Sequence, residues 1–432
     1  MFISLKALVL AFKLMKGMVI FMLSNDIKIV KNLAGKYAEI SNKDENLKKA
    51  LLHRGVNDLK MERPVVLMDE IPWNELKNEA GLVLECQDER FREIENYFRQ
   101  ELYRYENFCC DRVFTPFFPV RKVIYSTGFG ISVEESTISA DNGVISSHRY
   151  VDKLQTEEDL EKLTVPKITY DKEKTDENFS FASGVLNNIL PVKIVGIESG
   201  HGTGHRVWDD VSMLKGVTNL LIDLAERPEF MHKLAEKLTN IEIETAKQYE
   251  ELGLLEYNLY YLHCTAGATN DLTPPEDHEN VKLKNIWGRG VAQIFASVSP
   301  VMHEEFEIYY AKKVLESHGL VYYGCCEPLD RKIDIVRQIK NLRKISITPW
   351  ANINIAAEAI GKDYVVAVKP NPATLSLKNL DEKAVRDEIT NLYNACYKNS
   401  CSFEFTLKDI SSSGGNPKNL SKWAEIAMSI VK

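Results

Sequence analysis

Residues 320–370 read LVYYGCCEPLDRKIDIVRQIKNLRKISITPWANINIAAEAIGKDYVVAVKP, and this stretch decides the fold class. It holds three short runs rich in β-branched and aromatic residues, Leu320–Cys326, Lys344–Trp350 and Tyr364–Pro370. Each run has the length of a strand and is bounded by turn residues. Their hydrophobicity is nearly continuous rather than alternating, which is typical of parallel strands that are covered on both faces.

Five further runs of this kind extend the pattern along the chain. They are Pro64–Ile71, Arg112–Val120, Pro191–Ser199, Asn258–Cys264 and Ser402–Asp409. Helix starts lie between the runs, with cap residues and early prolines at Thr273–Glu276, Ser299–Pro300 and Asn379–Glu382. Eight alternating units favour an α/β fold, namely a closed (β/α)8 TIM barrel with N-terminal helices. A Rossmann-like open sheet with a cap is the alternative architecture.

The spacing of the runs predicts one insertion. About 70 residues separate the second run from the third, more than a barrel connection needs. Ile124–Ser136 and Gly143–Tyr150 predict an inserted β-hairpin region after the second strand, followed by a charged, turn-rich segment at Asp171–Asn178. The sequence contains no low-complexity linker or internal repeat, so residues 24–432 are expected to form one barrel domain.

Residues 1–23, MFISLKALVLAFKLMKGMVIFML, form an apolar leader. Lys13 and Lys16 argue against a signal peptide and against a spanning helix, because each central lysine costs about 3 kcal/mol of membrane insertion. We therefore expect the leader to be a start-site artefact, with translation beginning at Met18 or Met22. An additional amphipathic helix on the domain is the alternative.

Composition and charge restrict the classes of partner. The 432 residues carry a net charge of -8, so the chain as a whole does not attract nucleic acid or anionic membranes. The eight cysteines include no C-x-x-C motif, which excludes a zinc ribbon and a disulfide framework and suits a reducing cytoplasm. We expect a cytoplasmic protein with a small-molecule substrate and with neither a nucleic-acid nor a membrane partner.

In a barrel, the loops that follow the strands build the active site. Polar residues in these loops are the candidates for catalysis: Glu198, His263, Cys325 and Glu327. Because successive strand residues point to opposite faces, only one of each adjacent pair, His263–Cys264 and Cys325–Cys326, should face the lumen.

A second group of strand-end residues is expected to bind substrate. It comprises Trp73, His201, Trp350, Lys369, Asn371, Ser412 and Gly414. The tryptophans suit an aromatic mouth, and His201 lies in a glycine-rich segment that does not fit a dinucleotide motif. Ser412 and Gly414 precede a helix whose N-terminus suits a phosphate or carboxylate; a plain tight turn is the alternative.

Several segments resemble the uroporphyrinogen decarboxylase (URO-D) superfamily, in particular its methyltransferase-like branch with the methylcobalamin:coenzyme M methyltransferase relatives. The resemblance rests on the segments RPVVLMDEIPW, ISADNGVISSHRYVDKL, IWGRGVAQIFASVSPVMHEEF, VYYGCCEPLD and NLRKISITPWANINIAAEAIGKDYVVAVKPNP. The resemblance covers the chain from about residue 44 onward and implies a distorted (β/α)8 barrel. The decarboxylases carry Arg-x-x-Gly-Arg near the first strand, where this chain has Asp69–Trp73, so the resemblance does not favour porphyrinogen decarboxylation.

The methyltransferases of this family bind zinc through His-x-Cys and a later cysteine. Here the resemblance places Cys325 on the first cysteine, Tyr323 on the histidine and Ile410–Gly415 where the later cysteine is expected, so one of three ligands is retained. His263, at the end of a neighbouring run, is a candidate replacement ligand, so the resemblance makes His263 and Cys325 the candidate metal ligands. It implies methyl transfer between a small methylated substrate or a corrinoid protein and a thiol or other acceptor. Zinc and a corrinoid on a separate protein are the implied cofactors. The alternatives are a lyase acting on a carboxylated substrate and a non-catalytic ligand-binding protein.

Overall fold

The structure is a computed structural model that describes residues 24–139, 146–197, 202–257, 260–277 and 280–432. The expectations for the leader 1–23, for Glu198 and for His201 therefore concern positions outside the described residues.

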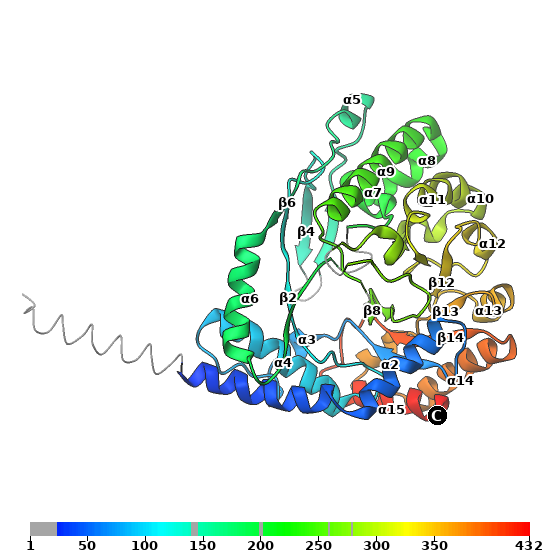
Figure 1. Cartoon of the computed structure of the whole chain (residues 1–432). Helices are drawn as coiled ribbons and strands as arrows, with labels where there is room; N and C mark the ends of the chain where they lie inside the picture. The colour runs from blue at the N-terminus through cyan, green and yellow to red at the C-terminus, as the bar shows by residue number, and fades with distance from the viewer. Residues whose placement is uncertain (1–23, 140–145, 198–201, 258–259, 278–279) are drawn as a thin grey trace, which may run out of the picture.

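A six-stranded parallel sheet forms the centre of the molecule (Figure 1). Its order is β1-β14-β13-β12-β11-β10, and every neighbouring pair is parallel. The strands are β1 (Val65–Met68), β10 (Trp287–Gly290), β11 (Leu320–Tyr323), β12 (Leu342–Ile347), β13 (Val365–Val368) and β14 (Ser402–Leu407). Nearly all of their residues are buried, which confirms the prediction of parallel strands covered on both faces.

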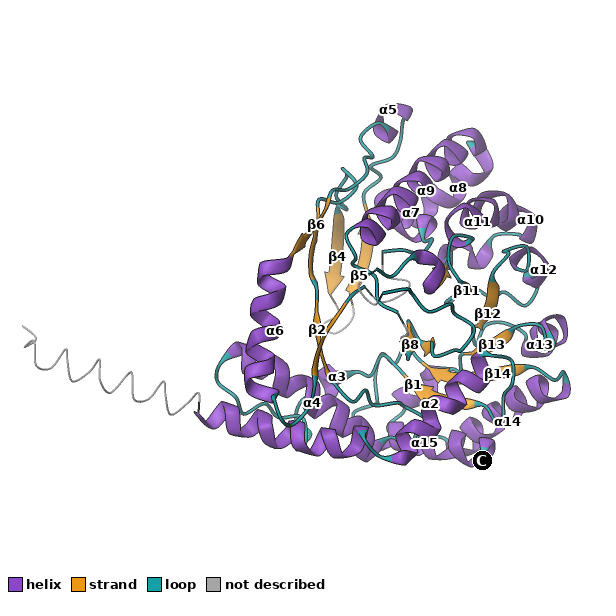
Figure 2. Cartoon of the chain, in the orientation of Figure 1, coloured by secondary structure: helices purple, strands orange, loops and turns teal. Residues whose placement is uncertain are grey.

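Helices follow most of these strands and cover the outer side of the sheet (Figure 2). They are α10 (Pro300–His303), α11 (Tyr309–Leu315), α12 (Ile333–Val336), α13 (Ile353–Ile360), α14 (Glu382–Lys398) and α15 (Lys418–Val431). Two predicted caps are confirmed: Ser299 Oγ accepts the Met302 N–H, and the Asp381 carboxylate accepts the Ala384 N–H. The helix start predicted at Thr273–Glu276 is wrong, because consecutive prolines disfavour the helical backbone and the described residues there form a loop.

The sequence-based list of strands is wrong at two places. It omitted β10, whose residues Trp287–Gly290 include two glycines and so lack the β-branched signature of a strand. A Cβ on Gly288 would lie 2.8 Å from the His318 ring, so close packing explains that glycine. The Asn258–Cys264 run is not a sheet strand: its β8 (Tyr261–Leu262) forms a short antiparallel hairpin with β9 (Thr265–Ala266).

Two more strands lie beside the main sheet. β2 (Phe118–Arg121) and β7 (Val192–Val195) pair in parallel as a separate two-stranded sheet. Single parallel bridges join Ile197 to Leu255 and His205 to Gly290. The chain is thus a mixed α/β protein with a six-stranded parallel sheet, and the ladders between its described residues show no closed barrel.

The inserted hairpin region is present where it was predicted. β4 (Glu135–Ser139) and β5 (Ser146–Tyr150) pair as an antiparallel hairpin, and β3 (Val123–Ser126) pairs with β6 (Ile168–Asp171). The segment predicted to be turn-rich is instead the first part of helix α6 (Lys172–Leu186). The Asp171 carboxylate accepts the Lys174 N–H, so this charged segment is a capped first helical turn.

Further helical elements lie before β1, in the inserted region and between the later strands. A helix over 24–41 precedes α2 (Asp44–Asn57) and packs against α4 (Glu89–Asn107) and α6, which agrees with the expected N-terminal helices. The described residues contain no helix long and apolar enough to cross a bilayer. The other helical elements are α3 (Trp73–Leu76), α5 (Glu157–Leu160), α7 (Val207–Lys215), α8 (Val217–Glu226), α9 (Pro228–Glu251), η1 (Leu283–Asn285), η2 (Gln293–Ser297), the π-helix η3 (Glu304–Ile308) and η4 (Pro372–Ser376).

Candidate functional site

The carboxyl ends of β1, β11 and β14 and the turn between β8 and β9 carry the polar residues of the candidate site. Glu70 follows β1, Cys325 follows β11 and Lys408 follows β14, while His263 and Cys264 form the hairpin turn. Neighbouring parallel strands end on the same side of a sheet, so these side chains converge.

Three residues of this region have a left-handed backbone. Glu70, Cys264 and Asp409 have φ of 49°, 55° and 55°, which is uncommon for residues other than glycine. The Asp409 N–H donates to Glu70 Oε2 at 2.8 Å and thereby ties the ends of β14 and β1 together. Residues with such a backbone cluster at active sites, so the two strand ends and the adjoining hairpin turn are a candidate functional site.

Two adjacent cysteines and one lysine form the centre of the site. The Lys408 ammonium donates to Cys325 Sγ at 3.3 Å and to Cys326 Sγ at 3.1 Å. The two sulfur atoms lie 3.7 Å apart, and Lys408 also forms an ion pair with Asp409 at 2.7 Å. We call Cys325, Cys326 and Lys408 the thiol cluster.

The thiol cluster stabilises one thiolate. The hydrogen bond that Cys326 donates lowers the pKa of Cys325, and His263, Lys408 and Arg289 lower it further against the opposing effect of burial. The same hydrogen bond and burial raise the pKa of Cys326. Burial disfavours the charged Lys408, but the thiolate and Asp409 outweigh it and raise the lysine pKa. Cys325 is therefore the thiolate and Cys326 the thiol that donates to it.

Glu327 is a fully buried carboxyl group beside this thiolate. Its Oε2 accepts the Cys325 N–H at 3.0 Å, and its Oε1 accepts the Ala292 N–H at 3.1 Å. Burial raises the pKa of Glu327 to about 7. Glu327 can therefore gain or lose a proton near neutral pH, as a general acid or base must.

A set of metal-ligand types lies next to the thiol cluster. Single ligand atoms of Glu70, His263 and Cys264 all lie within 4.8 Å of one another. Zinc accepts this combination of oxygen, nitrogen and sulfur donors. The prediction that only one residue of each adjacent pair faces inward is wrong, because His263–Cys264 is a hairpin turn and Cys325–Cys326 lies in the loop after Gly324. Side chains alternate only along an extended strand.

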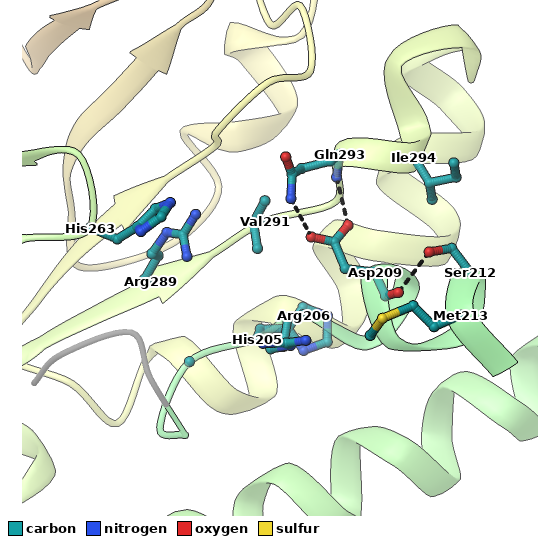
Figure 3. Close-up of a pocket in the computed structure, with 11 residues that line it drawn as sticks. His205, Arg206, Asp209, Ser212, Met213, His263, Arg289, Val291, Gln293 and Ile294 are labelled. Carbon is teal, nitrogen blue, oxygen red and sulfur yellow. Dashed lines mark hydrogen bonds between the residues drawn. The ribbon is translucent and has the colours of Figure 1, made fainter. Parts of the chain in front are cut away.

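The larger of two neighbouring cavities, about 520 Å³ in volume, begins beside His263. Figure 3 shows His263 and Arg289 together at one end of it, with Asp209 accepting two hydrogen bonds from Gln293 at the other. The guanidinium of Arg289 has no hydrogen-bond or ion-pair acceptor among the described residues, and its buried Nε is unsatisfied. A second cavity of about 260 Å³ is lined by Asp69, Arg104 and the same His263.

A buried polar network lies at the wall of the larger cavity, which His205 lines. His205 lies between Glu242 at 2.7 Å and Glu307 at 3.1 Å. Burial disfavours its charge, but the two carboxylates outweigh burial and raise the pKa of His205 to about 10. Tyr323 donates to Glu307 and contacts His303, so this hydroxyl points into the network. Tyr323 therefore does not replace the histidine ligand that the resemblance places at its position.

Several predicted substrate-binding residues have other roles. The Trp350 side chain is 71% exposed, and Trp73 packs against Tyr103 and Arg104. The Asn371 side chain caps η4 by accepting the Ala373 N–H. Of the predicted substrate-binding residues, Lys369 lies at the site, where its buried ammonium donates to the Cys264 carbonyl.

The predicted anion site at Ser412 and Gly414 is filled by the protein itself. Glu75 Oε2 accepts the Ser413 N–H at 2.7 Å and the Ser413 hydroxyl at 2.8 Å. Ser412 Oγ accepts the Gly414 N–H, so the two predicted residues close a tight turn. This corresponds to the alternative that the sequence pattern left open.

The structure brings together His263, Cys325 and Glu327 of the predicted catalytic group. Sequence reasoning did not select Glu70 or, beyond a cation for the predicted anion site, Lys408, although both lie at the ends of predicted strands. It missed Arg289 because Arg289 lies on β10, and the two glycines of β10 prevented its recognition as a strand.

Comparisons with known proteins concern the fold alone. No protein-family model and no curated protein sequence matches the chain at a significant level. Among solved structures, the chain is similar to a methyltransferase from Methanosarcina mazei, with a TM-score of 0.50 and 14% sequence identity. The match covers 88% of this chain and 97% of that chain. The α/β architecture described above is thus shared with a methyltransferase over most of both lengths.

Proposed function

We propose that the protein is a methyltransferase that moves a methyl group between a small methylated substrate, or a corrinoid protein, and a thiol or other acceptor. The observation that carries the proposal is the Cys325 thiolate, held by Lys408 and Cys326 beside the buried carboxyl of Glu327. A thiolate is the form of cysteine that attacks or accepts a soft electrophilic carbon.

We further propose that the fold is a distorted URO-D-like (β/α)8 barrel formed by residues 24–432 as one domain. The bridges Ile197–Leu255 and His205–Gly290, together with the bond from the Asp111 N–H to the Val66 carbonyl, support a ring that continues past both edges of the main sheet. The similarity in fold to a methyltransferase over 88% of the chain supports the same proposal. The scattered free cysteines support a location in the cytoplasm.

Each residue of the site has a defined role in this proposal. Cys325 supplies the thiolate, and Cys326 and Lys408 keep it charged. His263 orients the sulfur through its hydrogen bond to Cys325. Glu327 holds or releases a proton near neutral pH, so it can protonate the group that departs from the methyl carbon or deprotonate the acceptor.

The donor set Glu70, His263 and Cys264 fits zinc, and these residues would hold it. A bound zinc ion supplies positive charge that keeps a sulfur ligand in its thiolate form. The Cys264 thiol has its pKa raised by burial, so without such a charge it stays protonated.

To test this function, the protein is mixed with methylcobalamin and an added thiol. Methyl transfer is then measured as a change in the cobalamin absorption spectrum. Wild-type protein should produce the change, and Cys325→Ala should slow it at least about a hundredfold because the nucleophile is removed. Cys109→Ala is the matched control, since Cys109 is also followed by a cysteine but contacts no lysine hydrogen-bond donor within the described structure. Equal rates in wild type and Cys325→Ala contradict the proposal.

One observation favours a second candidate. The guanidinium of Arg289 lines the larger cavity without an acceptor among the described residues, and a substrate carboxylate satisfies such a group. A lyase on a carboxylated substrate would release carbon dioxide without cobalamin. Thermal stabilisation by a carboxylated ligand, with neither carbon dioxide release nor methyl transfer, would indicate a non-catalytic binder.

A further inference from the structure

The side chains of the adjacent cysteines Cys325 and Cys326 lie on the same side of the chain, with their sulfur atoms close together. On a strand, consecutive side chains diverge to opposite faces. Here Gly324 has φ of 97°, and the chain turns away from β11 before the two cysteines. Their sulfurs consequently lie 3.7 Å apart with Lys408 against both.

We propose that Cys325 and Cys326 are a reversible oxidation site, at which a peroxide converts the two side chains into a disulfide between adjacent residues. The oxidation itself does not depend on the proposed function. Its expected consequence, loss of methyl transfer, rests on the proposed function because it removes the Cys325 thiolate.

The reaction proceeds in two balanced steps. The Cys325 sulfur gives up its proton and attacks one peroxide oxygen, the O–O bond breaks, and the departing hydroxide takes up a proton, leaving a sulfenic acid on Cys325. The Cys326 sulfur then attacks the Cys325 sulfur, the S–O bond breaks, and hydroxide leaves with the Cys326 proton as water. In total, two thiols are oxidised by two electrons and one peroxide is reduced to two waters. A dithiol reductant reverses the change by thiol–disulfide exchange.

The surroundings accommodate both redox states. Cys326 is partly exposed, so an oxidant in solvent reaches the pair. Oxidation removes the negative partner of Lys408, which in a buried position is costly for an unpaired cation. Lys408 retains its ion pair with Asp409 at 2.7 Å, so the disulfide does not leave an isolated charge.

The chain contains two internal controls. Cys109–Cys110 is the same dipeptide, but Cys109 is exposed, Cys110 is buried, and the described contacts include none between their sulfurs. Cys396 and Cys401 interact with each other but are 0% and 3% exposed, so solvent oxidants do not reach them in the folded protein. Of these three cysteine pairs, Cys325 and Cys326 therefore combine sulfur atoms in contact with access to an oxidant in solvent.

The test is oxidation of the reduced, full-length protein with hydrogen peroxide, followed by alkylation of the remaining thiols and peptide mapping. The expected result is that two of the eight cysteines lose their reactivity, that both lie in the peptide containing Cys325 and Cys326, and that a dithiol restores them. In Cys326→Ser, Cys325 should instead accumulate as a sulfenic acid that a dimedone reagent traps. Cys109→Ser should behave as wild type.

Two outcomes overturn the proposal: a peptide map in which Cys325 and Cys326 stay alkylatable after oxidation, or one in which the disulfide joins other cysteines. The map requires no variant, so poor folding of Cys326→Ser does not remove the test. Methyl transfer is measured separately on the same samples. A mapped disulfide in a protein without methyl transfer contradicts only the proposed function, whereas activity without the disulfide contradicts only the oxidation site.

Discussion

Two copies of the same dipeptide, Cys109–Cys110 and Cys325–Cys326, differ in the groups that surround their first sulfur atom. Burial raises the pKa of both Cys109 and Cys110, and Cys110 packs in the main hydrophobic core. In the second pair the neighbouring thiol, His263 and Lys408 lower the pKa of Cys325. The comparison teaches that a cation and a hydrogen-bond donor at the sulfur, rather than the presence of two cysteines, make a reactive thiolate.

The residues that follow the two pairs extend the comparison. A carboxyl group stands two positions after the first cysteine in each case, Asp111 in one and Glu327 in the other. Asp111 forms two hydrogen bonds with the Arg63 guanidinium, at 2.8 and 2.7 Å. Glu327 accepts backbone N–H groups, and burial raises its pKa to about 7. One carboxyl is thus held by an ion pair and the other remains available for proton transfer.

The largest expected effect comes from breaking the ion pair between Asp111 and Arg63. Asp111→Asn removes the partner of Arg63 from a buried ion pair and should lower the free energy of unfolding by about 3 kcal/mol near neutral pH. Urea unfolding measures this loss. A change below about 1 kcal/mol would show that Asp111 has no structural role and would weaken the contrast with Glu327.

The matched variant Glu327→Gln should change the pH dependence instead. Because folding raises the pKa of Glu327, folding favours its protonated form. This contribution to stability is complete at pH values below the ordinary carboxyl pKa and is lost as the pH rises through about 7. Wild type should therefore lose stability between about pH 5 and about pH 8, and Glu327→Gln should lose less. Parallel pH profiles for the two proteins are the contrary result.

A smaller effect is expected from removing the cation of the thiol cluster. Lys408→Met should raise the pKa of Cys325 and slow its alkylation by iodoacetamide near neutral pH by about tenfold, because less thiolate is present. Lys49→Met is the control, since Lys49 acts on Cys109 through space without a hydrogen bond to its sulfur. It should alter Cys109 alkylation by less than about twofold. Peptide mapping measures both rates, and equal slowing at the two sites contradicts the distinction.

An effect of similar size concerns zinc, which should bind near Cys325–Cys326 and not near Cys109–Cys110. Glu70→Gln weakens one donor of the Glu70, His263 and Cys264 set and should reduce zinc affinity by about tenfold. Equilibrium dialysis of the purified protein against zinc gives this affinity. A zinc content below about 0.2 per wild-type chain, against the roughly unit stoichiometry of a tight site, would rule out the metal site.

The sequence predicted the parts of the fold that depend on local patterns. Runs such as Tyr364–Pro370 are nearly continuously apolar, and the structure contains buried parallel strands there. The sequence failed where a distant contact decides the conformation. β10 is a strand although its glycines disfavour one, because their small size lets His318 and Tyr323 pack against it. Asp171–Asn178 appeared turn-rich because the charges of a capped first helical turn resemble those of a loop.

The sequence-based prediction of the candidate site also succeeded in some places and failed in others. Position after a strand selected Cys325, Glu327 and Lys369, and the structure brings these residues to the candidate site, since polar residues at the carboxyl ends of parallel strands converge. The same criterion also selected Trp350 and Asn371, which are respectively exposed and engaged in a helix cap. Nothing in the local sequence distinguishes a strand end that faces the cavity from one that faces solvent.

The sequence by itself determined most of the buried strands and the residues at their ends, because strand length, apolar continuity and turn residues are properties of a few neighbouring positions. Only the tertiary structure decided which of the two identical Cys-Cys dipeptides carries a thiolate. Lys408 is 83 positions away from Cys325 along the chain, yet its ammonium lies 3.3 Å from the sulfur. The reason is physical. A pKa depends on the charges and hydrogen-bond donors within a few ångströms in space, and the parallel sheet that contains β1, β11 and β14 brings those groups together.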